Sequence, residues 1–179
     1  YSKENKTWSK AQKATALNTA VNEGFLSYSE KSKTAYFNRC NDAKSKDDFC
    51  RIYEVTYDEA NSTFGTPKPV ALSFTQKTTM KQPAISADGN TLYFAAKMDG
   101  GIGGYDIWML KKNGDSWDEP VNAGSVINTE FDEAFPTVRD SALIYSTEGL
   151  AGFGGLDLFV SVWANSSFSK PQNLKAPFN

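Results

Sequence analysis

The sequence predicts an all-β fold of repeated four-stranded antiparallel units, and three observations support this prediction. First, one pattern recurs with a period of about fifty residues: Pro83 and Pro136 are 53 residues apart, and Asp106 and Asp157 are 51 apart. Second, each copy alternates short runs of β-branched and aromatic residues with turns rich in Gly, Asn and Asp. Third, strand-rich repeats of this length are typical of propeller blades. We therefore expect a β-propeller.

The copy at residues 82–127 shows the elements of one blade most clearly. After a short first strand, the turn at Asp88 and Gly89 has the residues that tight turns require. The second strand is apolar on both faces, which indicates burial between two layers. A glycine-rich reversal precedes the third strand, and Pro120 restricts the fourth to a sheet edge. The expected strands are 83–86, 91–96, 105–110 and 117–121.

Two further blades are expected, at residues 134–176 and 24–75. The copy at 24–75 is the more divergent, and a polar loop between Cys40 and Cys50 replaces its glycine-rich reversal. Residues 8–17 match the start of a fourth strand, so we expect them to be the last strand of a preceding blade. Because propellers close with about four to eight blades, three blades plus one strand cannot form a ring. The chain is either a piece of a larger propeller, which we favour, or one of two chains that together complete a ring.

The two cysteines, Cys40 and Cys50, lie at the facing ends of two strand-like stretches joined by a polar loop. Cysteines in this arrangement can reach disulfide geometry. By the chain-entropy estimate, closing so short a loop would stabilise the fold by about 2–3 kcal/mol. Such a bond would indicate an oxidising compartment, and the alternative is two free thiols in a reducing cytosol. With no histidine and no third cysteine in the chain, the pair cannot complete a tetrahedral zinc site.

Composition excludes several classes of function. The chain has no histidine, which removes Ser-His-Asp and Cys-His nucleophiles and imidazole metal sites. A formal net charge of −2 provides no basic surface for nucleic acid, and no run of about 18 apolar residues is present to span a membrane. The chain begins at Tyr1 without methionine or a signal peptide, so we expect a mature form or an excised fragment. We expect no enzymatic activity, no metal and no cofactor.

Glycine–aspartate turns recur in the blades and raise the question of a calcium site. Calcium-binding glycine–aspartate repeats in β-helices follow one another about every nine residues, whereas these turns are about fifty residues apart. We therefore expect structural roles, in which the glycines take positive φ and the aspartates accept hydrogen bonds from turn amides. The residues concerned are Asp88, Gly89, Gly103, Gly104, Asp106, Gly154, Gly155 and Asp157.

An acidic segment just before the first strand of the last blade is the main candidate for a binding site. Glu130, Asp132 and Glu133 place three carboxylates within four residues, and this cluster occurs once. Such a group could bind a ligand or cation, act as an acid–base pair of the glycosidase type, or be a solvated loop. We expect a partner-binding loop. Trp163 has no aromatic counterpart in the other blades and is a further candidate for a contact surface. The recurring aromatics are expected in the core: Tyr93, Phe94, Trp108, Tyr145 and Phe159.

The second copy resembles a known family. The WD-like propeller repeat of TolB-type envelope proteins is similar to the run Gln82-Pro83-x-Ile85-Ser86-x-Asp88-Gly89-x-x-Leu92-Tyr93-Phe94, followed by Gly103-Gly104-Tyr105-Asp106-Ile107-Trp108. The acidic segment before Pro136 and the strands that carry Cys40 and Cys50 are similar to a narrower group of Gram-negative envelope proteins. That group combines tetratricopeptide repeats, such a propeller and a C-terminal OmpA-like peptidoglycan-binding domain. Some of its members belong to the type IX secretion and gliding machinery.

The resemblance, which covers roughly residues 24–175, implies a non-enzymatic scaffold that binds other envelope proteins. It implies a periplasmic, outer-membrane-associated location, with type IX secretion as one setting. A link to peptidoglycan would come only through domains that are absent here. Two alternatives stay open: a carbohydrate-binding or carbohydrate-cleaving propeller that uses residues 130–133, and a structural spacer within a longer chain.

Overall fold

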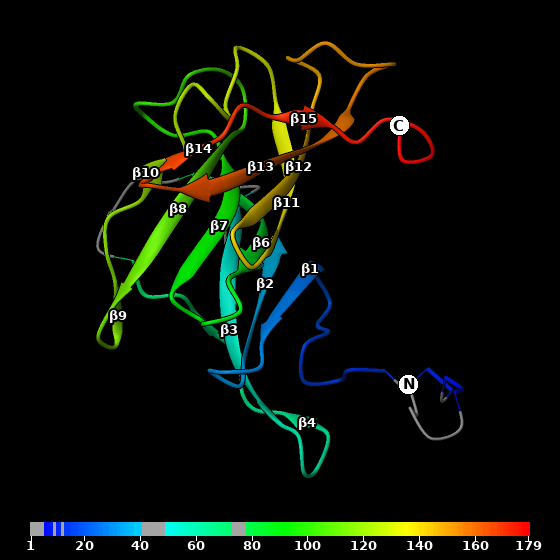
Figure 1. The fold of residues 1–179 in the computed structure, drawn as a ribbon. Helices are drawn as coiled ribbons and strands as arrows, with labels where there is room; N and C mark the ends of the chain where they lie inside the picture. Colours follow the sequence, from blue (N-terminus) through cyan, green and yellow to red (C-terminus); the bar gives the residue numbers. More distant parts are fainter. Residues whose placement is uncertain (1–5, 9, 12, 41–48, 73–77) are drawn as a thin grey trace.

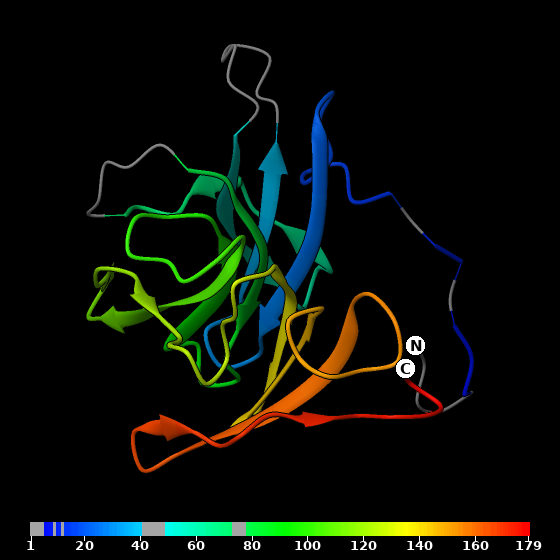
Figure 2. The ribbon, with the colours of Figure 1, turned by 90° about the horizontal axis from the view of Figure 1, so that it is seen from above.

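The computed structural model describes the chain except residues 1–5, 9, 12, 41–48 and 73–77. In the part described, every regular element is a β-strand, and the strands form three antiparallel sheets. The sheets follow one another in sequence order around a partial ring (Figure 1; Figure 2). The predicted all-β class and the partial propeller of antiparallel blades are therefore confirmed. Within the same described part, no helix is long and apolar enough to cross a membrane.

Each sheet is one blade of five strands, two of which are only two residues long. Blade 1 consists of β1 (Asn22–Ser29), β2 (Thr34–Cys40), β3 (Cys50–Asp58), β4 (Thr63–Phe64) and β5 (Lys68–Pro69). Blade 2 consists of β6 (Met80–Ile85), β7 (Thr91–Ala96), β8 (Asp106–Asn113), β9 (Ser116–Trp117) and β10 (Val121–Asn122). Blade 3 consists of β11 (Glu133–Arg139), β12 (Ala142–Thr147), β13 (Asp157–Ala164), β14 (Ser167–Phe168) and β15 (Gln172–Asn173).

The two short strands of each blade both pair with its third strand, so together they take the place of the predicted fourth strand. In blade 2, Trp117 lies opposite Lys112, and Val121 lies opposite Met109. Pro120 falls between the two short strands, where it removes no hydrogen bond from the ladder. The fourth strand of a blade is therefore split in two.

Hydrophobic clusters fill the space between successive blades, and β7 contributes to two of them. Leu92 and Phe94 pack into the cluster shared with blade 1, where the rings of Tyr36 and Trp117 have centroids 5.9 Å apart. Tyr93 packs into the cluster shared with blade 3. Because successive side chains of a strand point to opposite faces, this confirms the predicted burial of β7 on both sides. All five aromatics that were predicted for the core are buried.

Each first strand is interrupted by a β-bulge at the same position. Phe25, Gln82 and Phe135 lie in these bulges with φ of 50°, 54° and 53°, in the left-handed region that residues with side chains rarely adopt. First strands are free edges of their sheets, and a bulge interrupts the backbone groups with which another strand could pair. The bulge also breaks the alternation of apolar residues. For this reason the sequence predicted the first strand of blade 2 only from residue 83, whereas it begins at Met80.

The predicted last strand of a preceding blade, at residues 8–17, is not a strand in the part of this segment that the structure describes. Residues 15–17 form a turn instead. Fourth-strand segments pair with the third strand of their own blade, and none of the three described third strands pairs with this segment. Leu17 is nevertheless buried, because it packs against blade 1 in a cluster with Phe37 and Val55.

Candidate functional site

The segment that joins blades 2 and 3 is held in place by the side chain of Asn128. Its Oδ1 accepts a hydrogen bond from the Ile107 N–H at 2.8 Å, and its Nδ2 donates to the Ile107 carbonyl at 3.0 Å. Nδ2 also donates to Asn122 Oδ1 at 2.8 Å. Asn128 is 2% exposed, so its amide satisfies buried backbone groups of β8. The segment is therefore fixed to blade 2 before it enters blade 3.

Glu133, which was predicted as part of a partner-binding loop, is fully buried. It accepts hydrogen bonds from the Thr129 N–H at 2.9 Å, the Thr129 hydroxyl at 2.7 Å and the Thr147 hydroxyl at 2.6 Å. Burial raises the pKa of the Glu133 carboxyl, while these hydrogen bonds oppose the rise and the nearby charge of Asp106 adds to it. Glu133 therefore shapes the loop and cannot contact a partner directly.

Glu130 and Asp132, by contrast, are exposed. Asp132 Oδ1 accepts a hydrogen bond from the Tyr105 N–H at 2.8 Å, which ties the segment to the reversal before β8. Among the described residues, Glu130 has no hydrogen bond or ion pair. Because Glu133 lies inside the protein and the other two carboxylates lie at its surface, the three do not present a common site to one ligand. No group of three or more His, Cys, Asp or Glu in the described residues is placed to hold a metal ion.

Gly103 and Gly104, in the reversal before β8, serve close packing, and the prediction that these two glycines take positive φ is wrong. Neither Gly103 nor Gly104 has a positive φ. A Cβ on Gly103 would overlap the carbonyl oxygen of Thr129, and the space at Gly104 is equally tight. Gly154 and Gly155 lack positive φ too, and a Cβ there would meet nothing within 4 Å. The physical reason for the glycine pair before β8 is thus the neighbouring segment, which passes directly against it.

The aspartates that begin the third strands accept hydrogen bonds from amides of the preceding reversal. Asp106 accepts from the Ile102 N–H at 2.5 Å and from the Gly103 N–H at 3.3 Å. Asp157 accepts in the same way from the amides of residues 153 and 154. Both aspartates are buried, at 1% and 5% exposure. They therefore close the loops and are not available to an external ligand.

Asp88 has a comparable position in the turn between β6 and β7. It accepts hydrogen bonds from the Ser86 hydroxyl and the Asn90 N–H, and these bonds lower the pKa of Asp88. Gly89 has φ of 77°, and a Cβ there would lie 3.0 Å from the Cβ of Ser32 in blade 1. This turn therefore needs glycine both for its backbone conformation and for its contact with the neighbouring blade.

Exposed apolar side chains lie at the loop tips around the segment that joins blades 2 and 3. Ile102 is 41% exposed, Phe131 is 53% exposed and Phe153 is 70% exposed. All three lie at the end of the blades where the second strands finish and the third strands begin. We call these three residues, with Glu130 and Asp132, the loop-end surface. It combines apolar contact area with carboxylates that accept charge-assisted hydrogen bonds.

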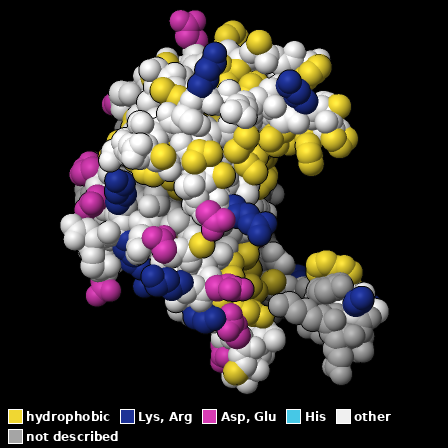
Figure 3. All heavy atoms as spheres, viewed as in Figure 1, with side chains coloured by type: hydrophobic (Ala, Val, Ile, Leu, Met, Phe, Trp, Pro, Cys, Tyr) yellow, Lys and Arg dark blue, Asp and Glu magenta, His cyan; other side chains and the backbone are white. Residues whose placement is uncertain are grey.

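A second candidate surface runs along the first strands of the blades. The rings of Phe25 and Phe135 have centroids 5.3 Å apart, and Gln82 Oε1 accepts a hydrogen bond from the Phe135 N–H at 2.8 Å. With Leu26 and Pro136 these residues line a groove of about 260 Å³. Figure 3 shows hydrophobic side chains gathered along the concave side of the molecule. Sequence analysis did not find this groove, because the bulges that form it break the strand pattern.

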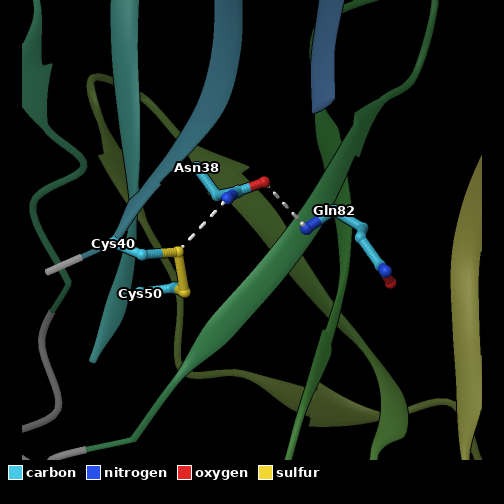
Figure 4. The surroundings of a disulfide bond; sticks show 4 residues. All are labelled: Asn38, Cys40, Cys50 and Gln82. Carbon is cyan, nitrogen blue, oxygen red and sulfur yellow. Dashed lines mark hydrogen bonds between the residues drawn. A yellow bond between two sulfur atoms is a disulfide. The ribbon is translucent and has the colours of Figure 1, made fainter. Parts of the chain in front are cut away.

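The predicted disulfide is confirmed: Cys40 and Cys50 are joined, as register partners at the facing ends of β2 and β3. Figure 4 shows Asn38 beside this bond, with its Nδ2 3.5 Å from Cys40 Sγ and its Oδ1 accepting from the Gln82 N–H at 3.4 Å. The disulfide thus lies next to a contact between blades 1 and 2. It is consistent with an oxidising compartment such as the periplasm. The polar loop between the cysteines lies outside the described residues, except for Phe49.

Trp163, the further candidate for a contact surface, is half-buried. Its ring packs edge-on against Phe168 with centroids 4.7 Å apart, and Lys111 Nζ lies 5.9 Å from its centroid. It lines a groove between blades 2 and 3 together with Asp88 and Asp140. Most of the contact area of Trp163 is therefore used within the fold.

One repeated motif was not recognised from the sequence. The pattern Asn-Thr-x-x-x-Glu occurs at residues 128–133 and again at residues 18–23. At the second place, the N–H and hydroxyl of Thr19 both donate to Glu23 Oε1, as Thr129 donates to the carboxylate of its own motif. The residues between Thr and Glu differ completely, which hid the match. The spacing of Asn, Thr and Glu was the available signal.

Comparison with known proteins bears on the fold. No protein-family model matches the chain, and no curated protein matches its sequence. Among solved structures, TolB from Acinetobacter baumannii is similar, with 15% sequence identity and a TM-score of 0.55. The match covers 87% of this chain and 33% of that protein, so this chain spans about a third of its length. At this level of identity the similarity shows the fold, a TolB-like β-propeller.

Proposed function

We propose that this protein is a non-enzymatic scaffold that binds other proteins in the periplasm of a Gram-negative envelope, in association with the outer membrane. The observation that carries the proposal is the loop-end surface, where three exposed apolar side chains lie beside two exposed carboxylates. The TolB-like fold and the disulfide support an envelope location.

The loop-end surface is suited to binding because it is held rigidly from below. Asn128 and Glu133 are buried directly beneath it, and each makes several hydrogen bonds. Gly103 and Gly104 allow the neighbouring reversal to pack against the same segment. A preorganised surface loses less conformational entropy when it binds. The exposed tips can therefore contribute most of their apolar contact to affinity.

The expected partner is a protein with an apolar contact patch flanked by lysine or arginine. Phe131 and Phe153 would supply apolar area, since aromatic residues are enriched at interface cores. Glu130 and Asp132 would orient the partner and select for basic groups. Type IX secretion is one setting for such a scaffold, on the basis of the sequence resemblance. Any link to peptidoglycan would require domains outside these residues.

The test is crosslinking with mass spectrometry on the full-length protein in its native cell envelope. We expect repeated crosslinks from Lys97, in the reversal before β8, to one or a few proteins. A variant with Glu130→Lys and Phe153→Ser should lose them, because it reverses one charge and removes the most exposed apolar tip of the surface. The side chain of Glu130 makes no hydrogen bond or ion pair with another described residue, so its replacement leaves the fold intact.

The matched control carries Asp115→Lys and Val162→Ser, which make the same kinds of change at the opposite end of the blades. It should keep the crosslinks. Equal loss in both variants would contradict a role for the loop-end surface. The absence of any partner, in a sample rich in crosslinks within the propeller, would contradict the scaffold itself. A glycan-binding array would then test the carbohydrate alternative.

A further inference from the structure

Within the residues that the structure describes, one backbone turn occurs three times, at residues 14–18, 124–128 and 175–179. In each copy the last two amides donate to the carbonyl of the first residue, with distances from 2.8 to 3.1 Å. The pairs are Leu17 and Asn18 to Ala14, Ile127 and Asn128 to Gly124, and Phe178 and Asn179 to Lys175. Each copy therefore ends on an asparagine in the same local geometry.

Two of these asparagines make the same contact with a third strand. Asn128 pairs with both backbone groups of Ile107 in β8, at 2.8 and 3.0 Å. Asn179 pairs with both backbone groups of Leu158 in β13, also at 2.8 and 3.0 Å. In the sheets, Ile107 and Leu158 hold equivalent places, opposite the residue before the last of the second strand. The asparagine at the end of the turn is thus the connector that fixes a blade to the segment that follows it.

The remaining asparagine, Asn18, has the same turn but no such partner. It is exposed, and its side chain has no hydrogen bond to another described residue. The residues after it already have their inter-blade conformation, since Thr19 and Glu23 are bonded as in the motif between blades 2 and 3. Glu23 also pairs with Arg39 of blade 1 at 3.0 Å. On the blade 1 side of this junction, the contacts of Thr19, Glu23 and Arg39 are therefore already made.

The apolar residue before each asparagine packs against the blades that lie beside it. Ile127 is fully buried in a cluster that contains Ile107 of blade 2 and Leu143 of blade 3. Leu17 packs only against blade 1, and Phe178 is 66% exposed. Ile127 thus packs between two blades, whereas Leu17, which is 7% exposed, packs against one.

We propose that residues 17–23 are the docking edge for the third strand of a preceding blade of the same polypeptide, with the Asn18 amide bonded to that strand's backbone. A second copy of this chain is the less suitable occupant. The equivalent peptide groups on β8 and β13 are already bonded, at Ile107 and at Leu158. At Ile107 and at Leu158, a second copy could bond Asn18 only by displacing Asn128 or Asn179.

The test supplies such a blade to the chain. A copy of residues 80–116 is joined directly ahead of Trp8, so that Trp8 follows the copied third strand as Trp117 follows β8, and Asn18 lies one residue closer to that strand than Asn128 does to β8. Hydrogen exchange with mass spectrometry is then compared between this extended chain and the 179-residue chain. We expect the amides of residues 17–21 to exchange at least about tenfold more slowly in the extended chain, because they become part of a closed junction.

Substitution of the asparagines gives a second readout, and its part in the 179-residue chain does not depend on the extended chain folding. In the 179-residue chain, Asn128→Ala should lower the Tm by about 4–8 °C, because buried backbone groups of Ile107 lose their partner. Asn18→Ala should leave the Tm of this chain unchanged and lower it in the extended chain. An equal loss for both variants in the 179-residue chain would show that Asn18 already has a partner, and would overturn the proposal.

Two further results would also overturn it. One is a folded extended chain in which residues 17–21 exchange as fast as before. The other is a dimeric mass for the 179-residue chain in light scattering, together with slow exchange at residues 17–21, which would identify a second copy as the occupant. Neither result bears on the loop-end surface, so this proposal and the scaffold function are tested separately.

Discussion

Glu133 is a buried carboxylate that is not in an ion pair with any described residue. Three hydrogen bonds donated by Thr129 and Thr147 stabilise the charged form of its carboxylate. Its counterpart Glu23 makes equivalent bonds to Thr19 and in addition has Arg39 as a partner. The same residue type is thus used in two junctions with different charge compensation. The consequence for Glu133 is that its burial is not offset by a cation among the described residues, so its pKa is raised.

We expect the free energy of unfolding to rise as the pH falls through the raised pKa of Glu133 towards its ordinary value of 4.5. The pKa of Glu133 is raised in the folded protein above its ordinary value of 4.5. Its contribution to stability is therefore complete below the unfolded pKa and is lost as the pH rises through the folded pKa. Denaturant titrations at several pH values measure this slope, and Glu133→Gln should abolish it.

Carboxyl groups whose pKa is lowered in the folded protein do not oppose this slope in the pH range above their ordinary pKa values. Asp58, Glu59 and Asp88 have lowered pKa values, so the stability they contribute is lost only as the pH falls below their ordinary range. Glu130→Gln, at an exposed position, is the matched control and should keep the slope. An unchanged slope in Glu133→Gln would contradict the assignment.

Two equivalent glycines should respond differently to the same substitution. Gly103→Ala should lower the free energy of unfolding by about 1–3 kcal/mol, because the new Cβ overlaps the backbone of residues 129–130. Gly154→Ala should change it by no more than about 0.5 kcal/mol, because the space around that position is open. Urea denaturation of the two variants measures the difference. Equal effects would show that the packing of the joining segment does not depend on glycine.

At the scale of elements, the β2–β3 hairpin of blade 1 differs from its counterparts in being closed by a covalent bond. The reversals before β8 and β13 are closed by Asp106 and Asp157, which bind the loop amides. Blade 1 has Cys50 at the start of its third strand, bonded to Cys40 across the ladder. The disulfide therefore closes this hairpin at the end where the other blades use a buried aspartate.

Removal of this bond should destabilise the protein. We expect Cys40→Ala with Cys50→Ala to lower the free energy of unfolding by about 2–3 kcal/mol, from the greater entropy of the unfolded chain. Thermal denaturation with and without a reducing agent measures the effect. The reducing agent should lower the Tm of the unmodified protein and leave that of the double variant unchanged. A Tm that is insensitive to reduction in both proteins would contradict a stabilising role.

The elements differed in how well the sequence predicted them. The second strand of blade 2 was predicted with its observed bounds, 91–96, because its apolar residues face both ways and turns bound it closely. The first strand was predicted too short, because the bulge at Gln82 interrupts the alternation. Residues 8–17 have the composition of a fourth strand, and their described part is not paired as one, because a strand also requires a partner to pair with.

At the scale of the whole molecule, blades are joined by residues that pack against both neighbouring blades. Ile127 is fully buried between blades 2 and 3, whereas Phe178, at the same place after blade 3, is 66% exposed. Stability of repeat proteins is approximately a sum of unit and interface contributions. Substitutions at these two positions therefore measure what one closed junction contributes.

We expect Ile127→Ala to lower the free energy of unfolding by about 2–5 kcal/mol, since it removes a buried side chain and leaves a cavity between blades. Phe178→Ala should change it by no more than about 0.5 kcal/mol, because the ring is mostly in solvent. Denaturant unfolding monitored by tryptophan fluorescence gives both values. Similar losses for the two variants would indicate that Phe178 is covered by another surface in solution.

The sequence by itself determined the class, the repeat and the disulfide. These features rest on local information: the alternation of residues in a strand, the turn residues between strands, and the positions of Cys40 and Cys50 at facing strand ends. Each is visible within a window of about ten to fifty residues. The absence of histidine also excluded whole classes of chemistry without any reference to the fold.

Only the tertiary structure decided which side chains of the acidic segment are available to a partner. Glu133 and its neighbour Glu130 are alike in sequence, yet one is fully buried and the other is exposed. Asn128 acquires its role from Ile107, 21 residues away. Burial and hydrogen bonding depend on contacts between segments that a local pattern does not contain, so the site became visible only when blades 2 and 3 were packed together.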